Sequence, residues 1–176
     1  SVIDAFNERL FHIPYPTAAP ALFEPIDYTI ESGGKRLRPT LLLRTAMACG
    51  ADAMDAINLA IGIELFHNFT LLHDDIMDNA DVRRGRSSVH CRWNDNVAIL
   101  SGDAMLTLAT GYMNSIPGET GRRIFELFTK TALEIYQGQQ LDMEFEDRDN
   151  VSVDEYIRMI RLKTSVLLGC ACRIGA

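Results

Sequence analysis

Apolar residues repeat at helical spacing over most of the chain, and no segment alternates between apolar and polar positions as a half-buried strand would. Good helix formers fill residues 40–49, and Gly50 follows them as a stop. Between Asp52 and about Asp78 there is no proline, and apolar residues recur at Ile57, Ile61, Leu65 and Leu72. This spacing predicts a long, largely buried helix.

Further along the chain, polar segments alternate with segments of helical composition. Residues 79–96 are polar and rich in Arg and Ser, which predicts a loop. Helical composition returns over residues 97–113, and Pro117-Gly118 then breaks the chain before a helix expected over about 121–146. Ser152–Glu155 has the form of a capping box, which predicts the start of another helix.

The two ends of the chain differ in regularity. Ser1 to Pro25 holds four of the 6 prolines, so any early helix is interrupted there. Residues 162–176 keep a helical character, and the sequence is expected to finish inside a helix. Because strands, internal repeats and low-complexity tracts are not predicted, residues 1–176 are expected to form a single all-α domain.

Composition narrows the class of protein. The chain has 176 residues, 47% of them hydrophobic and 23% charged, which is typical of a globular domain with one core. Lys and Arg number 17 against 24 Asp and Glu, so the formal net charge is -7. That charge repels nucleic acid and anionic membranes unless the basic residues are clustered. We therefore expect no nucleic-acid partner.

Cysteine usage and hydropathy bear on location. The 4 cysteines show neither paired spacing nor a disulfide-dense pattern, so we expect buried thiols in a reducing compartment and no structural zinc site. The sequence opens without a basic leader, and its apolar stretches fall far short of the ~20 residues that cross a bilayer. These features predict a cytoplasmic protein with no membrane span.

Three carboxylates crowd the end of the longest predicted helix. At ~100° per residue, Asp74 and Asp78 lie one turn apart on the same side, and Asp75 lies about a quarter-turn round. Like charges at this spacing repel unless a cation or water neutralises them. The cluster indicates either a solvated acidic helix end or a site for a hard divalent ion, for which magnesium fits best.

A histidine shares the face of that helix with two of the carboxylates. His67 lies about 20° from the direction of Asp74, so His67, Leu71, Asp74 and Asp78 form one stripe. A histidine on such a helix can be an ordinary core residue with satisfied hydrogen bonds. Its alignment with the aspartates favours a functional role instead.

Basic residues gather in two turns. Gly33–Pro39 and Arg83–Gly85 together hold five of the 17 Lys and Arg residues. Glycines let backbone amides approach an anion closely, and Arg offers a planar fork that suits phosphate. Each turn alone is also typical of a solvated loop. Together with the carboxylates, the two turns predict a site that suits two diphosphates at once.

Six motifs, in this order, resemble those of the trans-isoprenyl diphosphate synthases, the polyprenyl synthetase family. They are Gly33–Pro39, His67–Asp78, Arg83–Gly85, Ser101–Asp103, Gly138-Gln139 with Asp142, and Lys163-Thr164. The resemblance extends from about residue 14 onwards and fits the short-chain type. It implies an isoprenoid-synthase-type helical bundle that forms a homodimer.

The family's second aspartate-rich motif lies downstream of the Lys-Thr pair, and the sequence ends before it. The chain is therefore expected to be the amino-terminal portion of such a domain, incomplete at its carboxy-terminal end. By itself it is expected to be inactive.

The resemblance implies roles for individual residues. The diphosphate of isopentenyl diphosphate would be held by Lys35, Arg38, His67 and Arg84. The allylic diphosphate would be contacted by Arg83, Gln139, Lys163 and Thr164. Magnesium would be held by Asp74, Asp75 and Asp78, with Asp142 as a further carboxylate. Catalysis would rest chiefly on Asp74, Asp78, Arg83 and Lys163.

In this family a bulky residue five positions before the first aspartate motif limits the length of the product. Phe69 stands at that position, and Phe66 lies a further turn below it. Helix geometry places Phe69 ~140° from Asp74, whereas Phe66 and Thr70 lie nearer the aspartate stripe. Phe69 is thus either the floor of the product pocket or an ordinary core residue. With Phe69 as the floor, the expected product is about C15 to C20.

Two classes of protein fit these features. One is a magnesium-dependent prenyltransferase that condenses isopentenyl diphosphate with an allylic diphosphate. The other is a non-catalytic partner subunit of a heteromeric prenyl diphosphate synthase. Terpene cyclases share the aspartate-rich motif but have no need to hold isopentenyl diphosphate, so Lys35, Arg38 and His67 argue against them.

Overall fold

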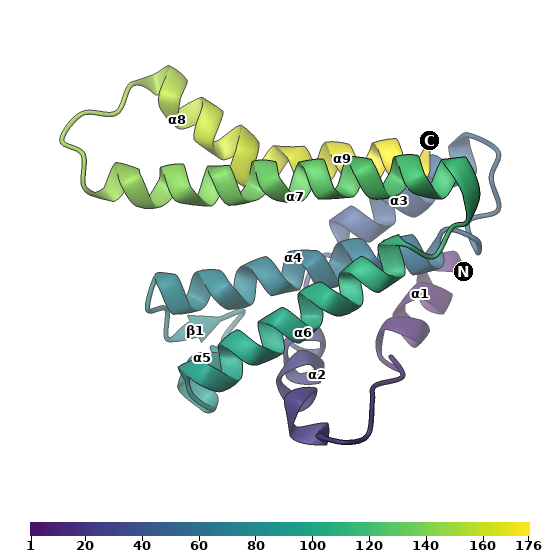
Figure 1. Ribbon diagram of the computed structural model, residues 1–176, viewed down its shortest axis with the longest axis horizontal. Coiled ribbons are helices and arrows are strands. Elements are labelled where there is room, and N and C mark those ends of the chain that lie inside the picture. Colours follow the sequence, from purple (N-terminus) through teal and green to yellow (C-terminus); the bar gives the residue numbers. More distant parts are fainter.

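The computed structural model describes residues 1–176 and is almost entirely helical (Figure 1). Its elements are α1 (Val2–Leu10), a 3-10 turn η1 (Pro20–Leu22), α2 (Glu24–Glu31), α3 (Leu37–Ala48), α4 (Ile57–Met77), β1 (Val82–Arg83), β2 (Arg86–Ser87), α5 (Val89–Arg92), α6 (Asp95–Met113), α7 (Gly118–Glu146), α8 (Val153–Ile160), a π-helical turn η2 (Arg161–Ser165) and α9 (Val166–Gly175). The predicted all-α class is confirmed.

Several predicted boundaries are wrong by a few residues. The long helix α4 begins at Ile57 rather than Asp52, because residues before it form a turn in which Asp52 Oδ1 accepts from the Met54 amide. Helix α6 begins at Asp95, because Asn94 caps it by accepting a hydrogen bond from the Val97 amide. The capping box at Ser152 opens α8 as predicted.

Two regions contain structure that the sequence pattern did not predict. Helix α2 follows the proline-rich opening, since Pro25 occupies its first turn, where no amide donor is needed. The predicted loop over residues 79–96 contains an antiparallel pair of two-residue strands, β1 and β2, and the short helix α5. The expectation that extended segments are absent is therefore wrong at this hairpin.

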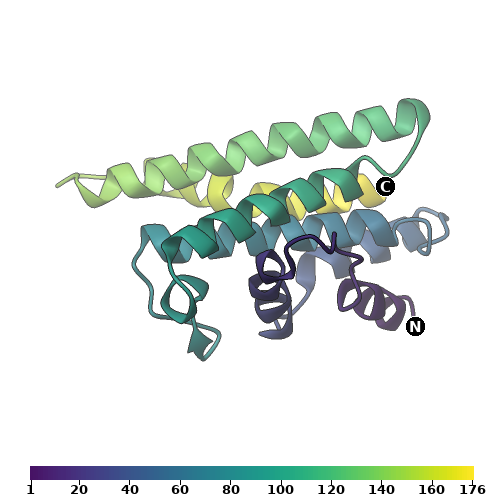
Figure 2. The same cartoon turned by 60° about the horizontal axis from the view of Figure 1, so that its bottom comes forward.

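Helix α4 is the centre of the bundle and is apolar nearly all round, which is why it can be buried on every side. It packs against α6 and α3, and α3 packs in turn against α9. In both views α7 and α9 lie along one side of α4 and α6, whereas α1 and α2 lie on the opposite side (Figures 1 and 2). One hydrophobic core joins these elements.

Two glycines permit close backbone contacts, one between α7 and η2 and the other between α9 and α3. A Cβ at Gly138 of α7 would lie 2.3 Å from the backbone nitrogen of Lys163 in η2. A Cβ at Gly175 of α9 would lie 2.3 Å from the Leu42 carbonyl oxygen in α3. Contacts this short exclude any side chain, so Gly138 sets how closely η2 approaches α7.

The cysteines differ from expectation. Cys170 is buried, but Cys49 and Cys91 are exposed, so the prediction of buried thiols is wrong for these two. All 4 are free, and no disulfide links any pair. No helix combines the length and the apolar character needed to cross a bilayer.

Candidate functional site

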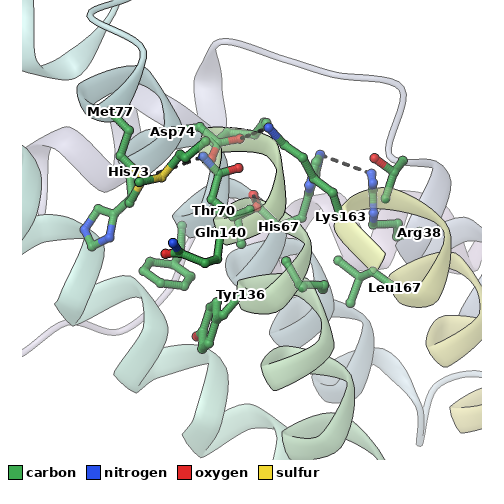
Figure 3. A pocket seen from close by; sticks show the side chains of 16 residues that line it. Arg38, His67, Thr70, His73, Asp74, Met77, Tyr136, Gln140, Lys163 and Leu167 are labelled. Carbon is green, nitrogen blue, oxygen red and sulfur yellow. Dashed lines mark hydrogen bonds and ion pairs between the residues drawn. The ribbon is translucent and has the colours of Figure 1, made fainter. Parts of the chain in front are cut away.

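A cleft of about 530 Å³ lies between α4, α7 and the η2–α9 segment (Figure 3). It brings together eight of the predicted site residues from elements far apart in the sequence. They are Arg38, His67, Phe69, Thr70, Asp74, Gln139, Lys163 and Thr164. The cleft has a carboxylate region at the end of α4, a cationic region beside α3 and an apolar wall.

Lys163 links a carboxylate that lines the cleft, Asp74, to one that does not, Asp142. Its Nζ lies 2.5 Å from Asp142 Oδ2 on α7 and 3.9 Å from Asp74 Oδ2 on α4. Burial lowers the pKa of Lys163, but the hydrogen bond to Asp142 and the charge of Asp74 outweigh it, so the pKa is raised overall. Burial also raises the pKa of Asp74, against the opposing effect of Lys163. Two carboxylates thus share one cation.

The remaining aspartates of the predicted metal set lie elsewhere. Asp75 is 4% exposed, and its Oδ1 accepts from Arg83 Nε at 2.9 Å and Nη2 at 2.6 Å. Asp78 is exposed at the C-terminal cap of α4. Neither Asp75 nor Asp78 lines the cleft, and no group of three acidic, histidine or cysteine side chains converges anywhere in the chain. The stripe predicted along α4 therefore enters the cleft with His67, Leu71 and Asp74 only.

Arg38 supplies the positive charge of the cationic region, and His67 lies against it. Arg38 Nη1 lies 3.1 Å from His67 Nε2 (Figure 3). A guanidinium only donates, so Nε2 accepts and the imidazole is neutral, with its proton on Nδ1. Burial, together with the charges of Arg38 and Arg84, lowers the pKa of His67 to about 3. His67 is therefore an uncharged group held against arginines.

The other predicted cations surround this region without lining the cleft. Lys35 is exposed in the loop before α3. Arg84 has a left-handed backbone in the hairpin turn, with φ 54°, and its guanidinium donates to the Gly33 carbonyl oxygen. It also donates to Asn68 Oδ1 at 3.4 Å. The two basic turns predicted from the sequence, Gly33–Pro39 and Arg83–Gly85, are therefore in contact in the fold.

The depressed pKa of His67 predicts a pH dependence of stability. Below pH 6.5 an unfolded chain protonates this imidazole, whereas the folded protein resists protonation until about pH 3. Stability is thus present above pH 6.5 and is lost as the pH falls. Replacing His67 with Gln should reduce that acid-side loss by at most about 1.4 kcal/mol per pH unit.

Chemical denaturation of wild type and His67→Gln between pH 7.5 and pH 4.5 measures this difference. His12→Gln, at an exposed position beyond α1, is the matched control for loss of an imidazole. Equal slopes of unfolding free energy against pH for wild type and His67→Gln would show that the imidazole is not buried as described.

Aromatic side chains form the apolar wall. Phe69 lines the cleft with Thr70, and its ring meets Tyr136 edge-on at 6.3 Å and His73 at 4.8 Å. Phe66 does not line the cleft, because it is fully buried beneath Phe69. Helix geometry placed Phe69 ~140° from Asp74 on α4. Both residues nevertheless line the cleft, because the cleft extends round α4 to α7, which contributes Tyr136.

Some lining residues were not identified from the sequence. His73 is held by a 3.2 Å contact of its Nε2 with the Ile99 carbonyl oxygen, and a Cβ at Gly102 would lie 2.2 Å from that nitrogen. Gly102, in the Ser101–Asp103 motif, therefore leaves room for the His73 ring, and it was the one feature of the sequence that could have pointed to His73. Tyr136 and Gln140 gave no signal, since only the packing of α7 brings them to the cleft.

Comparison with known proteins extends these observations. The polyprenyl synthetase family model matches residues 19–176. A geranylgeranyl diphosphate synthase of Methanosarcina mazei is 40% identical over 178 residues, covering 100% of this chain and 54% of the relative. A geranylfarnesyl diphosphate synthase of Natronomonas pharaonis is 37% identical, covering 99% of this chain and 55% of the relative.

The fold agrees with a solved relative of the same kind. A crystal structure of a geranylgeranyl pyrophosphate synthase superposes with a TM-score of 0.95 at 50% identity, over 99% of this chain and 54% of that chain. The bundle is therefore of the isoprenoid-synthase type, and the chain spans about half the length of the relatives it matches. It belongs to the polyprenyl synthetase family.

Proposed function

We propose that the full-length gene product is a magnesium-dependent prenyltransferase that joins isopentenyl diphosphate to an allylic diphosphate. The observation that carries this proposal is the cleft itself. It combines the carboxylate of Asp74, joined through Lys163 to Asp142 just outside the lining, with a separate cationic region at Arg38, beside His67, and an apolar wall. The family relatives named above are prenyl diphosphate synthases, which supports the same assignment.

Each diphosphate would have its own set of contacts. Isopentenyl diphosphate is assigned to the cationic region, where Arg38 and His67 line the cleft and Lys35 and Arg84 lie in the adjoining turns. The allylic diphosphate is assigned to the carboxylate region. Its proposed contacts are Gln139, Lys163 and Thr164, which line the cleft, and Arg83, which does not line it and is paired with Asp75. Gln139 Oε1 is buried without a hydrogen-bond partner, so it has an acceptor to offer a ligand or water.

The residues at the carboxylate region fit magnesium. Asp74 and Asp142 already gather around one cation, the ammonium of Lys163, and magnesium takes a few carboxylates together with phosphate oxygens. Asp78 lies at the end of the same helix, and Asp75 is held by Arg83. When bound, magnesium would supply positive charge that stabilises the leaving diphosphate.

Residues of this chain would assist each step of the reaction. The allylic C–O bond breaks, and its electron pair leaves with the diphosphate, whose growing charge Lys163 and Arg83 stabilise. The isopentenyl double bond attacks the allylic carbon, a C–C bond forms, and the new cation loses a proton from an adjacent carbon to the departed diphosphate, which restores a double bond. Phe69, Ile135 and Leu167 line the cleft and keep water from the cation.

We propose a short product of about C15 to C20, because the Phe69 side chain takes up space in the apolar part of the cleft. In the full-length gene product, Phe69→Ala should yield longer products, since the space it opens can be filled by the growing chain. Chromatography of the products made from one primer measures the change. An unchanged length distribution in an active variant would remove Phe69 from the floor and leave Phe66 or Thr70 as candidates.

The matched control for this variant is Phe128→Ala. Phe128 is 2% exposed and packs against Phe66 at 5.2 Å, but it does not line the cleft. Its loss creates a core cavity of similar size, and it should leave the product length unchanged.

A condensation assay tests the proposed function. Purified full-length gene product is incubated with labelled isopentenyl diphosphate, several allylic primers and magnesium, and the products are sized. We expect labelled prenyl diphosphates. If the protein forms no product alone but does so with a second subunit, it is the non-catalytic partner of a heteromeric synthase.

The family resemblance also predicts a homodimer and a cytoplasmic location for the full-length protein. Light scattering of the purified protein gives the oligomeric state, and fractionation of cells gives the compartment. A monomer, or recovery with the membrane fraction, would contradict these two predictions.

A further inference from the structure

A buried carboxylate on α4 has no role in the site as assigned so far. Glu64 is 2% exposed and lies one turn before Asn68, which is fully buried. Its Oε1 accepts a hydrogen bond from Arg36 Nη1 at 2.5 Å and another from Asn68 Nδ2 at 3.1 Å. A buried ion pair adds little net stability, because desolvation offsets the attraction. A contribution to stability alone therefore gives a poor account of Glu64.

The bond to Arg36 fixes the loop before α3. Arg36 precedes that helix with a left-handed backbone, φ 48°. Its Nη2 also donates to the Ile30 carbonyl oxygen at 2.6 Å, so one guanidinium joins the end of α2 to α4. Arg38 follows in the first turn of α3, where it meets His67. The ion pair with Glu64 thereby sets the position from which Arg38 reaches the cleft.

The bond to Asn68 orients the hairpin arginine. The Asn68 amide nitrogen donates to the Glu64 backbone oxygen at 2.8 Å as well as to its carboxylate. Both bonds turn Asn68 Oδ1 toward Arg84, whose Nη1 it meets at 3.4 Å. The guanidinium of Arg84 lies against Gly34, where a Cβ would be 3.0 Å from Cζ. Glu64 thus reaches both basic turns.

Glu64 also opposes the crowding of positive charge in this region. Burial lowers the pKa of Arg38 and of Arg84, and the carboxylate of Glu64 acts in the opposite sense on both. Arg36 and Arg83 add further positive charge around His67. Without Glu64, these arginines would repel one another until a diphosphate neutralised them.

We propose that Glu64 is a positioning residue for isopentenyl diphosphate: through Arg36 and Asn68 it holds Arg38 and Arg84 in the binding arrangement before the ligand arrives. This inference rests on the proposed function. Preorganised cations bind an anion more tightly, because less conformational freedom is lost on binding. No hydrogen bond or ion pair joins Glu64, Arg36 or Asn68 to Asp74 or Lys163, so the allylic region should be affected less.

Steady-state kinetics of the full-length gene product with Glu64→Gln test the inference. The substitution keeps the shape of the side chain and removes its charge. We expect the KM for isopentenyl diphosphate to rise about tenfold, as a charge-assisted bond is lost, with kcat and the allylic KM changed less than about twofold. Calorimetric titration with isopentenyl diphosphate should show the same loss of affinity without turnover.

A control and a second variant complete the test. The control is Thr131→Val on α7, which removes the hydrogen bond of a buried hydroxyl to the Leu127 carbonyl oxygen. It should leave both KM values unchanged. If Glu64→Gln fails to fold, Asn68→Leu decides, since it keeps the Glu64–Arg36 ion pair, removes the Asn68 bonds to Glu64 and Arg84, and should raise the same KM several-fold. Equal increases in both KM values, or no increase, would overturn the inference. Absence of condensation by wild type would instead refute the proposed function.

Discussion

Replacing Asp74 with Ala is expected to lower turnover of the full-length gene product by about three orders of magnitude at saturating magnesium. Asp74 is the one aspartate of the first motif that lines the cleft, and it lies 3.9 Å from Lys163. Its loss removes a proposed metal ligand whose effect grows as charge develops on the leaving diphosphate. Folding should survive, because burial already raises the pKa of this carboxyl and its charge is not needed for stability.

The measurement is kcat with saturating substrates, together with the thermal midpoint as a check on folding. Asp78→Ala should behave in the same way, although Asp78 is exposed at the helix end. Asp81→Ala is the control, since this exposed carboxylate lies just beyond the motif and outside the cleft. Retention of more than about a tenth of wild-type activity by either motif variant would contradict the metal assignment.

Gly138→Ala is expected to damage both stability and activity. Its Cβ would lie 2.3 Å from the Lys163 nitrogen and 2.7 Å from the Leu162 carbonyl carbon, and backbone atoms cannot rotate away. Overpacking of this kind costs about 1–3 kcal/mol of unfolding free energy. The displaced η2 would carry Lys163 away from Asp142, and a shift of about 1 Å at a catalytic group lowers turnover about a hundredfold.

Denaturant titration and kcat measure the two effects in the full-length gene product. Gly169→Ala on α9 is the matched control, because nothing lies within 4 Å of its added Cβ. That variant should keep wild-type turnover and gain up to about 1 kcal/mol of stability, since Gly is a poor helix former. Wild-type stability and activity in Gly138→Ala would show that α7 and η2 do not approach as closely as described.

The helices could be predicted where their signals are local. The capping box at Ser152 and the apolar repeat of α4 depend on neighbours in the sequence, and both were identified correctly. Helix α2 was missed because prolines were interpreted as breakers, whereas Pro25 at a helix start is compatible with the helix. The π-helical turn η2 lies where the Lys163 backbone meets Gly138 of α7, and no local pattern in the sequence predicts it.

The site could be predicted only in part, for the same reason. Helical geometry correctly placed His67 and Asp74 on one face. It also placed Asp75 a quarter-turn away. In the structure Asp75 points away from the cleft and is ion-paired with Arg83 of the hairpin. The contact of Lys163 with Asp142 joins two segments that are distant along the chain. Spacing within one helix cannot reveal such a pair.

The contacts of buried polar residues were the hardest feature to predict from the sequence. Glu64 stands in an apolar stretch of α4 and looks like a single interruption of the helix pattern. Only the fold brings it to Arg36, which lies 28 positions earlier. The same holds for Asn68 and Arg84.

The central claim is that the two diphosphates are held differently, one by cations directly and the other through a metal. Isothermal titration calorimetry of the full-length gene product, with and without EDTA, tests it with isopentenyl diphosphate and with an unreactive thiolo analogue of an allylic diphosphate. We predict that EDTA changes the affinity for isopentenyl diphosphate less than about twofold and lowers that for the allylic analogue at least about a hundredfold. Equal losses for both ligands, or no loss for the allylic analogue, would contradict the account.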